Sequence, residues 1–307
     1  MQIKDIRLYP DRDDVFLSIY ILEDSPEILP GQKRPAVLVC PGGAYLGTSD
    51  REAEPVALRF AARGYHAFVL RYSTYYCGNM KDIPAGGASA PGNPHARYPG
   101  PLLDLARAML LIGDHADNWL VDTDRIAVCG FSAGGHLAAS LGVHWADPWL
   151  GEMAGAESRR LRPAAMILCY ALTDYQAMQS KVRQAAAQNP SVLGTWHAVN
   201  QAVFQKPEPS PAELEKASPA RYVNEKTPPA FIWHTADDGL VPVDNALNMA
   251  SAMADQGLSF ELHIFAHGDH GLALADNTTA AGAEQISEPV QAWVQLAQTW
   301  LSHLFQN

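Results

Sequence analysis

The sequence predicts an α/β fold with a mostly parallel central sheet. Short apolar runs recur along the chain, and segments compatible with helices separate them. Several of these runs are apolar throughout, as is typical of strands that helices cover on both faces of a parallel sheet. At 307 residues, the chain has a length at which α/β folds commonly form one domain. We therefore expect a single domain over residues 1–307.

The expected strands are short runs bounded by residues that interrupt regular structure. The run at 36–40 lies between Pro35 and Pro41, which indicates a short buried strand. The run at 126–129 leads directly into a glycine-rich bend. In chain order, the expected strands cover residues 5–9 (at a sheet edge), 15–22, 36–40, 65–72, 126–129, 164–171, 230–234 and 259–265.

The expected helices alternate with these strands. Residues 52–63 end at Gly64, which readily adopts the left-handed conformation that closes a helix. Residues 101–119 carry Leu102 and Leu105 on one apolar stripe, the pattern of a helix that packs on a core. In chain order, the expected helices cover residues 52–63, 101–119, 136–143, 244–256 and 289–305.

Two segments do not fit this alternation. Residues 73–99 are rich in glycine, alanine, proline and tyrosine, and residues 174–229 combine a helix at 175–188 with a proline- and glutamate-rich stretch. Both leave from the carboxyl ends of strands, where open α/β sheets bind ligands. We therefore expect two lid-like insertions that cover a site, the alternative being mobile surface insertions.

Composition narrows the class of partner. The net charge of −11 disfavours binding to nucleic acid or to an anionic membrane. The four cysteines form no Cys-x-x-Cys pair, so neither a zinc site nor a disulfide framework is expected. Residues 1–5 lack a basic segment followed by an apolar core, so no signal peptide is expected, and no apolar run approaches the length of a membrane span. We expect a cytoplasmic protein without metal or cofactor. The sequence leaves open whether the protein forms a homo-oligomer.

The bend after residues 126–129 carries a candidate nucleophile. Gly130-Phe131-Ser132-Ala133-Gly134 has the pattern Gly-x-Ser-x-Gly, with a strand before it and a helix after it. A sharp strand-to-helix turn exposes the serine hydroxyl above the sheet edge, and flanking glycines leave room for it. An ordinary serine in a glycine-rich turn is the alternative, but the flanking elements favour Ser132 as a nucleophile.

Two later loops offer the partners that a serine nucleophile needs. A base must accept the hydroxyl proton, and an acid must orient the base. In folds of this type the order along the chain is Ser, Asp, His, each after a later strand. The loop at 235–242 contains Asp237 and Asp238, and the loop at 266–272 follows the next strand. Both loops are expected at the same sheet edge as Ser132.

The second loop and its strand contain three histidines. His263 lies within the expected strand and is assigned a structural role, whereas His270 lies beside Gly271, where the backbone bends freely. His267 and His270, with Asp269, could also be considered metal ligands, but their spacing matches no strong zinc pattern. His270 is therefore the preferred base.

Acyl transfer also requires donors for the oxyanion. The amide of Ala133 lies at an expected helix start, where the helix dipole favours negative charge. Further donors are expected in the small-residue loop at 40–45, for which a structural Gly-Gly turn is the alternative.

Four motifs in order resemble the α/β-hydrolase fold. Within that fold, the chain is similar to small acetyl esterases, acetylxylan-esterase-like proteins and sugar-ester hydrolases. The resemblance extends over roughly residues 35–304 and is specific for the superfamily but weaker for the substrate. The motifs lie at residues 41–52, 130–137, 233–243 and 267–272.

The resemblance implies a role for each matching residue. Ser132 would be the nucleophile and His270 the base, and the family's Asp-x-x-Val-Pro acid motif selects Asp238 over Asp237. The related His-Gly-Gly-Gly enzymes imply oxyanion donors at Gly43 and Ala44, joined by Ala133. This chain departs from that pattern because Pro41 replaces the histidine and Ala44 replaces the third glycine.

The functional prediction is a serine carboxylic-ester hydrolase that forms an acyl-enzyme. The resemblance implies small acyl groups, acetyl first, on small-molecule esters that include acetylated carbohydrates. Tyr45, Tyr72 and Trp196 are expected to bind the substrate by stacking on a sugar, simple packing being the alternative. Two other functions stay open: a peptidase or acylaminoacyl hydrolase of the same fold, and a ligand-binding relative without catalysis.

Overall fold

The computed structural model describes residues 1–83 and 92–306, so the expected insertion at 73–99 lies partly outside the described residues. Its eight strands form one sheet in the order β1-β2-β4-β3-β5-β6-β7-β8. The strands are β1 Gln2–Tyr9, β2 Arg12–Ile21, β3 Arg34–Cys40, β4 His66–Arg71, β5 Val121–Phe131, β6 Ala165–Cys169, β7 Ala230–Thr235 and β8 Phe260–Phe265.

The sheet is antiparallel at one edge and parallel elsewhere. β1 pairs with β2, and β2 with β4, in antiparallel fashion. From β4 to β8, all neighbouring strands are parallel. This arrangement confirms the predicted α/β class, and it brings the carboxyl ends of β3, β5, β6, β7 and β8 to one edge of the sheet.

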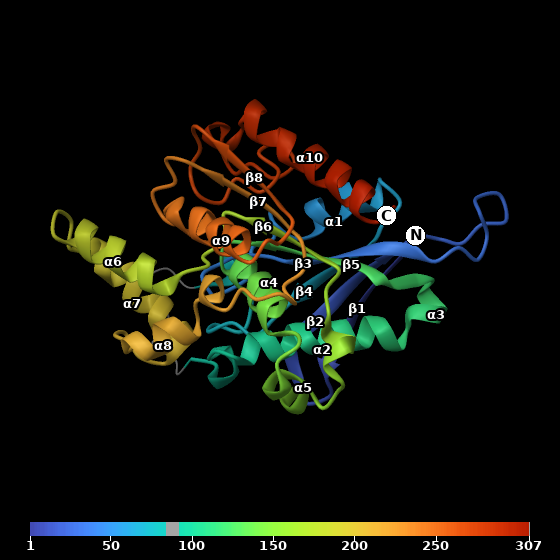
Figure 1. Cartoon of the computed structure of the whole chain (residues 1–307), viewed down its shortest axis with the longest axis horizontal. Coiled ribbons are helices and arrows are strands. Elements are labelled where there is room, and N and C mark those ends of the chain that lie inside the picture. Colours follow the sequence, from blue (N-terminus) through green and yellow to red (C-terminus); the bar gives the residue numbers. More distant parts are fainter. Residues whose placement is uncertain (84–91, 307) are drawn as a thin grey trace.

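Helices cover both faces of the sheet (Figure 1). Buried side chains of α1 and α10 pack on one face, and those of α2, α4 and α9 on the other. None of the helices in the described ranges is long and apolar enough to cross a bilayer. The α-helices are α1 Glu54–Ala61, α2 Gly100–Asp114, α3 Ala116–Trp119, α4 Ala133–His144, α5 Pro148–Ala154, α6 Tyr175–Ala186, α7 Ser191–Phe204, α8 Pro211–Lys216, α9 Asp244–Asp255 and α10 Glu288–Leu304.

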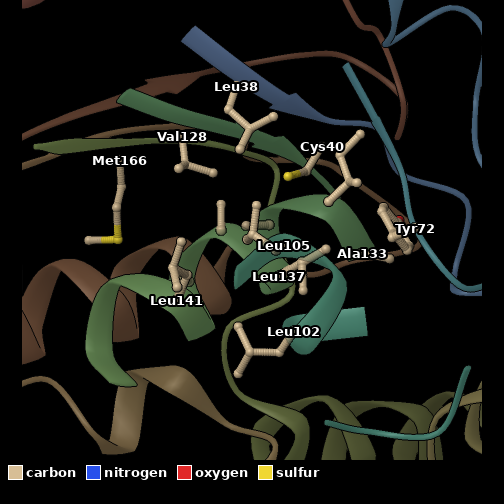
Figure 2. Packing of buried hydrophobic residues seen from close by; sticks show 14 of the residues in the cluster. Leu38, Cys40, Tyr72, Leu102, Leu105, Val128, Ala133, Leu137, Leu141 and Met166 are labelled. Carbon is tan, nitrogen blue, oxygen red and sulfur yellow. The ribbon is translucent and has the colours of Figure 1, made fainter. Parts of the chain in front are cut away.

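The central strand β3 shows why these runs are continuously apolar. Leu38 and Cys40 belong to the core beneath α2 and α4, whereas Val37 and Val39 belong to the core beneath α1 and α10. Successive side chains of a strand point to opposite faces, so a strand covered on both sides must be apolar at every position. Figure 2 shows Leu38 and Cys40 of β3 above the apolar side of α4.

The second insertion is a helical unit with a closed base. It contains α6, α7 and α8, and Figure 1 shows these helices extending away from the sheet. Its two ends meet, because the Tyr175 amide donates to Ser218 Oγ at 2.9 Å and the Ala220 amide donates to the Thr173 carbonyl at 3.1 Å. Arg221 also pairs with Asp174 at 2.9 Å.

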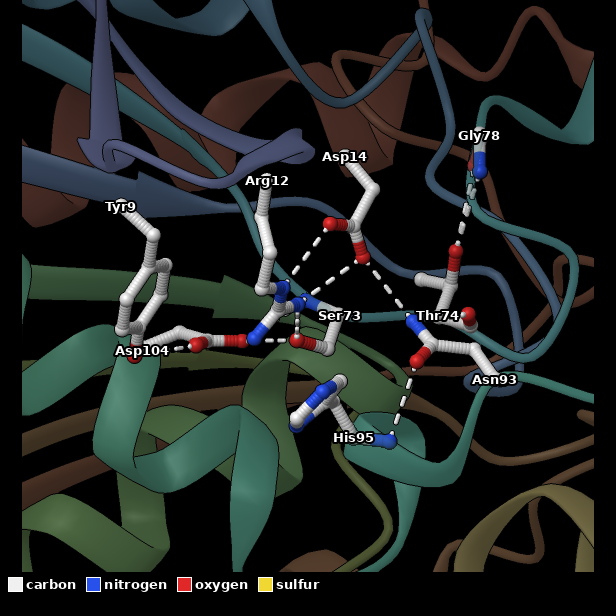
Figure 3. Close-up of polar contacts among 9 residues, drawn as sticks. All are labelled: Tyr9, Arg12, Asp14, Ser73, Thr74, Gly78, Asn93, His95 and Asp104. Carbon is white, nitrogen blue, oxygen red and sulfur yellow. Dashed lines mark hydrogen bonds and ion pairs between the residues drawn. The ribbon is translucent and has the colours of Figure 1, made fainter.

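The described part of the first insertion is anchored by a polar cluster around Asp104 (Figure 3). The buried Asp104 carboxylate accepts from the Ser73 amide at 2.8 Å, from the Ser73 hydroxyl at 2.5 Å and from Tyr9 Oη at 2.8 Å. Two residues further on, the amide of Tyr75 donates to the carbonyl of Tyr45. Through Ser73, the cluster fixes the start of this insertion to α2.

Several helices differ from the sequence expectation. The helix expected at 101–119 is two helices, α2 and α3, that meet at His115. α5, α7 and α8 were not predicted. α8 begins with a capping box, in which Ser210 and Glu213 each bond the other's backbone amide; the Ser-x-x-Glu pattern is a sequence signal for it.

Candidate active site

Ser132 lies at a strained turn between β5 and α4. Its backbone has φ 52° and ψ −116°, a conformation that residues with a side chain seldom adopt. The turn closes tightly, because a Cβ on Gly130 would overlap the Gly134 carbonyl and one on Gly134 would overlap the Cys40 carbonyl. The two glycines therefore permit the close backbone approach that holds Ser132 at the sheet edge.

The structure brings Ser132, His270 and Asp238 into one hydrogen-bonded chain. His270 Nε2 lies 2.8 Å from Ser132 Oγ, and His270 Nδ1 lies 2.7 Å from Asp238 Oδ2. An ionised carboxylate only accepts, so Nδ1 carries the proton and Nε2 is free to accept the serine proton. The side chain of Asp238 is fully buried, whereas that of His270 is 14% exposed.

Asp238 is held as a charged acceptor. Its Oδ1 accepts from the amides of Leu240 and Val241, both at 2.9 Å, and His234 Nε2 lies 3.3 Å from its Oδ2. Burial alone would raise the pKa of Asp238, but the hydrogen bonds from His234 and His270 outweigh burial and hold that pKa well below its usual range. The carboxylate therefore stays ionised at neutral pH.

Asp237 occupies a different position on the same loop. Its carboxylate accepts from the Gly268 amide at 2.8 Å and lies 2.9 Å from His267 Nδ1. Hydrogen bonds from His267 and Gly268 lower the pKa of Asp237. Both side chains are largely exposed. Because His267 and His270 bond separate carboxylates, the two imidazoles do not converge on a common metal position.

Two of the three predicted oxyanion donors line the cavity at Ser132. These donors are Ala44 and Ala133, whereas Gly43 is not among the lining residues. Within the described ranges, the amides of Gly43, Ala44 and Ala133 donate to no protein acceptor. Ala44 has φ 56° and Gly43 has φ 130°, so the loop after β3 is built in the left-handed region where glycine is favoured.

A cavity of about 340 Å³ opens from Ser132 between the sheet edge and the second insertion. Its walls come mainly from α6, α7 and the loop that carries Asp238. Apolar side chains predominate, with Lys181 and Thr195 among the polar residues. The volume is at the lower end of the range for small-molecule sites. The apolar lining residues of α6 and α7 include Met178, Val182, Ala185, Val192, Trp196 and Val199.

The three predicted substrate-binding aromatics differ in their placement. Tyr45 and Trp196 line the cavity. The prediction for Tyr72 is wrong, because this side chain is 1% exposed, lies outside the lining and donates from its hydroxyl to the Pro41 carbonyl at 2.6 Å. Tyr72 therefore supports the loop after β3 from behind and has no surface for a sugar.

The sequence reasoning assigned no role to His136. This residue is fully buried one turn after Ser132, and its Nε2 donates to the Ala217 carbonyl at 2.8 Å. Its Nδ1 therefore accepts from Tyr45 Oη at 2.5 Å. Burial lowers the pKa of His136 to about 4, which keeps the ring neutral. Its position four residues after the serine was the available signal.

The fold and the site together define a class of protein. A mostly parallel sheet carries a serine on a strained strand-to-helix turn, with an aspartate and a histidine on later loops at the same edge. This combination is that of a serine esterase with the α/β-hydrolase fold.

Comparison with known proteins places the chain within that class. The BD-FAE family matches residues 92–253, and the chain belongs to this family of α/β hydrolases. An acetyl ester-xyloside bifunctional hydrolase from Caldicellulosiruptor lactoaceticus is 31% identical, with a TM-score of 0.72 over 98% of this chain and 96% of that one. The carboxylesterase Cest-2923 from Lactobacillus plantarum is 28% identical, with a TM-score of 0.77 over 99% and 98% of the two chains.

A curated relative is much longer than this chain. The endo-1,4-beta-xylanase B of Butyrivibrio fibrisolvens is 32% identical over 257 residues, which is 81% of this chain and 34% of that protein. The chain spans about a third to a half of the length of the first curated relatives it matches. These findings confirm the resemblance to esterases of the α/β-hydrolase fold.

Proposed function

We propose that the chain hydrolyses small carboxylic esters, acetyl esters first, through an acyl-enzyme on Ser132. The observation that carries the proposal is the hydrogen-bonded chain from Ser132 Oγ through His270 to Asp238, at the mouth of a small cavity. The similarity to an acetyl ester-xyloside hydrolase supports acetylated xylose-containing sugars as the natural substrate class.

The acylation step follows from the geometry. Ser132 Oγ attacks the ester carbonyl carbon while its proton passes to His270 Nε2, and Asp238 stabilises the resulting imidazolium through Nδ1. The carbonyl oxygen becomes an oxyanion, which the amides of Ala44, Gly43 and Ala133 would bind. A single donor of this kind is worth about 3–4 kcal/mol in a well-studied protease. The proton on Nε2 then moves to the departing alcohol.

Deacylation repeats these roles with water. His270 takes a proton from water as the water oxygen attacks the acyl carbon, and the proton then returns to Ser132 Oγ as the carboxylic acid leaves. The cavity would hold the substrate through apolar contact with its lining, to which Tyr45 and Trp196 contribute.

Hydrolysis of p-nitrophenyl acetate by the wild type and by Ser132→Ala tests this function. We expect the substitution to lower kcat by about 10⁴-fold or more, because the nucleophile is lost while binding stays. Equal activity in both proteins would contradict the proposal. A second series, acetylated xylo-oligosaccharides against long-chain p-nitrophenyl esters, tests the substrate class, and preference for the long chains would contradict it.

A further inference from the structure

Glu52 is a buried carboxylate behind the loop that follows β3. It is 4% exposed, and within the described ranges no cation pairs with it. Its Oε2 accepts from the Gly42 amide at 2.7 Å, and its Oε1 accepts from Tyr170 Oη at 2.6 Å. Burying a carboxylate without a cation is unfavourable, so its two donors must hold it firmly in this position.

Tyr170 continues this link to the loop that carries His270. Its hydroxyl donates to Glu52 and accepts from the Ala273 amide at 3.0 Å. Its ring stands edge-on to the His270 ring, with centroids 5.0 Å apart. Burial and the neighbouring Glu52 raise the pKa of Tyr170, so its hydroxyl keeps its proton.

The loop after β3 is tightly packed at Gly42. A Cβ on Gly42 would lie 2.8 Å from the Glu52 carboxylate, 2.8 Å from the Phe131 carbonyl and 3.0 Å from Ser132 Cβ. Gly42, the residue before Gly43, is therefore fixed between the turn at Ser132 and the carboxylate. A continuous path of hydrogen bonds runs from Gly42 through Glu52 and Tyr170 to Ala273.

We infer that Glu52 and Tyr170 are positioning residues. They hold the loop after β3, which would bind the oxyanion, at a fixed distance from the loop that carries His270, with Ser132 between the two loops. Neither side chain lines the substrate cavity. The inference rests on the proposed esterase function, because it concerns the alignment of that site. Both partners of Glu52 are donors, so a carboxylate satisfies both, whereas an amide of the same size accepts from only one of them.

The test uses Glu52→Gln, Tyr170→Phe and the double variant. Misplaced donors weaken binding of the transition state more than binding of the ester, so kcat falls and KM changes little. With p-nitrophenyl acetate, we expect each single variant to lower kcat by about 10- to 100-fold, with KM within about twofold. The double variant should be no slower than the slower single variant, because both residues act through one connection.

Tyr9→Phe is the matched control. Tyr9 also donates from its hydroxyl to a buried carboxylate, that of Asp104, at 2.8 Å, but it lies on β1 and does not line the cavity. This variant loses the same kind of hydrogen bond, so its thermal midpoint should fall by a similar amount while kcat stays at the wild-type value.

Several outcomes would overturn the inference. Wild-type kcat in Tyr170→Phe, in a protein that needs Ser132 for hydrolysis, would show that the link does not position the site. If kcat and KM change equally, or if the losses in kcat multiply in the double variant, Glu52 and Tyr170 support the fold without positioning the site. Activity that survives Ser132→Ala would instead contradict the proposed function. If Glu52→Gln does not fold, Tyr170→Phe alone decides, because its ring still fills the same space.

Discussion

Asp237 and Asp238 are adjacent residues with different surroundings. Asp238 is buried, accepts from two amides and lies 2.7 Å from His270, whereas Asp237 lies at the surface beside His267. Asp237 also holds the Gly268 amide, so it steadies the loop that presents His270. Asp238 therefore contacts the proposed base directly, whereas Asp237 contacts only the loop that carries it.

Replacing each aspartate by asparagine should separate these positions. Asp238→Asn leaves a side chain that donates toward His270 and favours the wrong tautomer, so kcat for p-nitrophenyl acetate should fall by about 10³- to 10⁴-fold. Asp237→Asn keeps a hydrogen-bond acceptor, and its kcat should stay within about fivefold of the wild type. A larger loss in Asp237→Asn than in Asp238→Asn would show that the acid is misassigned.

Individual residues could be predicted where a local pattern carries the constraint. Ser132 is marked by flanking glycines that the turn requires. The order of loops indicated where the acid and the base lie but left Asp237 and Asp238 open, and the resemblance to a family selected Asp238. The prediction for Tyr72 was wrong, because the sequence around a tyrosine that follows a strand does not show whether its hydroxyl faces a cavity or, as here, a backbone carbonyl. Glu52 was not singled out, since its partner Tyr170 lies 118 residues away in the sequence.

At the scale of elements, α6 and α7 form much of the wall of the cavity. Val182 on α6 and Val199 on α7 line it, whereas Ala198 on α7 is exposed and lies outside the lining. The neighbouring positions on α7 therefore provide one substitution that fills the cavity and another that does not.

Val199→Trp should restrict the cavity to the smallest esters. The indole would occupy part of the roughly 340 Å³ of open space, so kcat/KM for p-nitrophenyl butyrate should fall at least about tenfold further than that for the acetate. Ala198→Trp adds the same group at the surface and should leave the ratio unchanged. An unaltered ratio in Val199→Trp would show that substrates do not enter between these helices.

The central strands were predictable because burial on both faces requires an apolar residue at every position. The helices of the second insertion were harder, since α7 contains Gly194 and Thr195, and α8 is a short helix in a proline-rich stretch. Their helical form depends on packing around Trp196 and Phe204 and on the cap at Ser210. The local periodicity of the sequence does not predict such tertiary contacts.

At the scale of the whole molecule, two buried histidines make stability depend on pH. Burial lowers the pKa of His66 and of His136 to about 4, against 6.5 when exposed. Between pH 6.5 and 4 the unfolded chain binds these protons and the folded chain does not. The free energy of unfolding should therefore fall on acidification, by about 1.4 kcal/mol per pH unit for each histidine.

Urea unfolding at pH 7, 5.5 and 4.5 measures this dependence. His66 accepts from the Leu22 amide and bonds the Leu120 carbonyl, far from Ser132, so His66→Gln keeps both kinds of hydrogen bond. This variant should lose the contribution of one histidine to the slope between pH 6.5 and 4. The same slope in the wild type and the variant would contradict the role of His66.

The closed base of the second insertion has a consequence for engineering. Chain entry at Tyr175 and chain exit at Ser218 are hydrogen-bonded to each other, next to the ion pair of Asp174 and Arg221. A helical unit from a relative could therefore be grafted between these anchors without altering the register of any strand. Substrate recognition could then be exchanged by replacing this helical unit, while Ser132, Asp238 and His270 stay on an unchanged sheet.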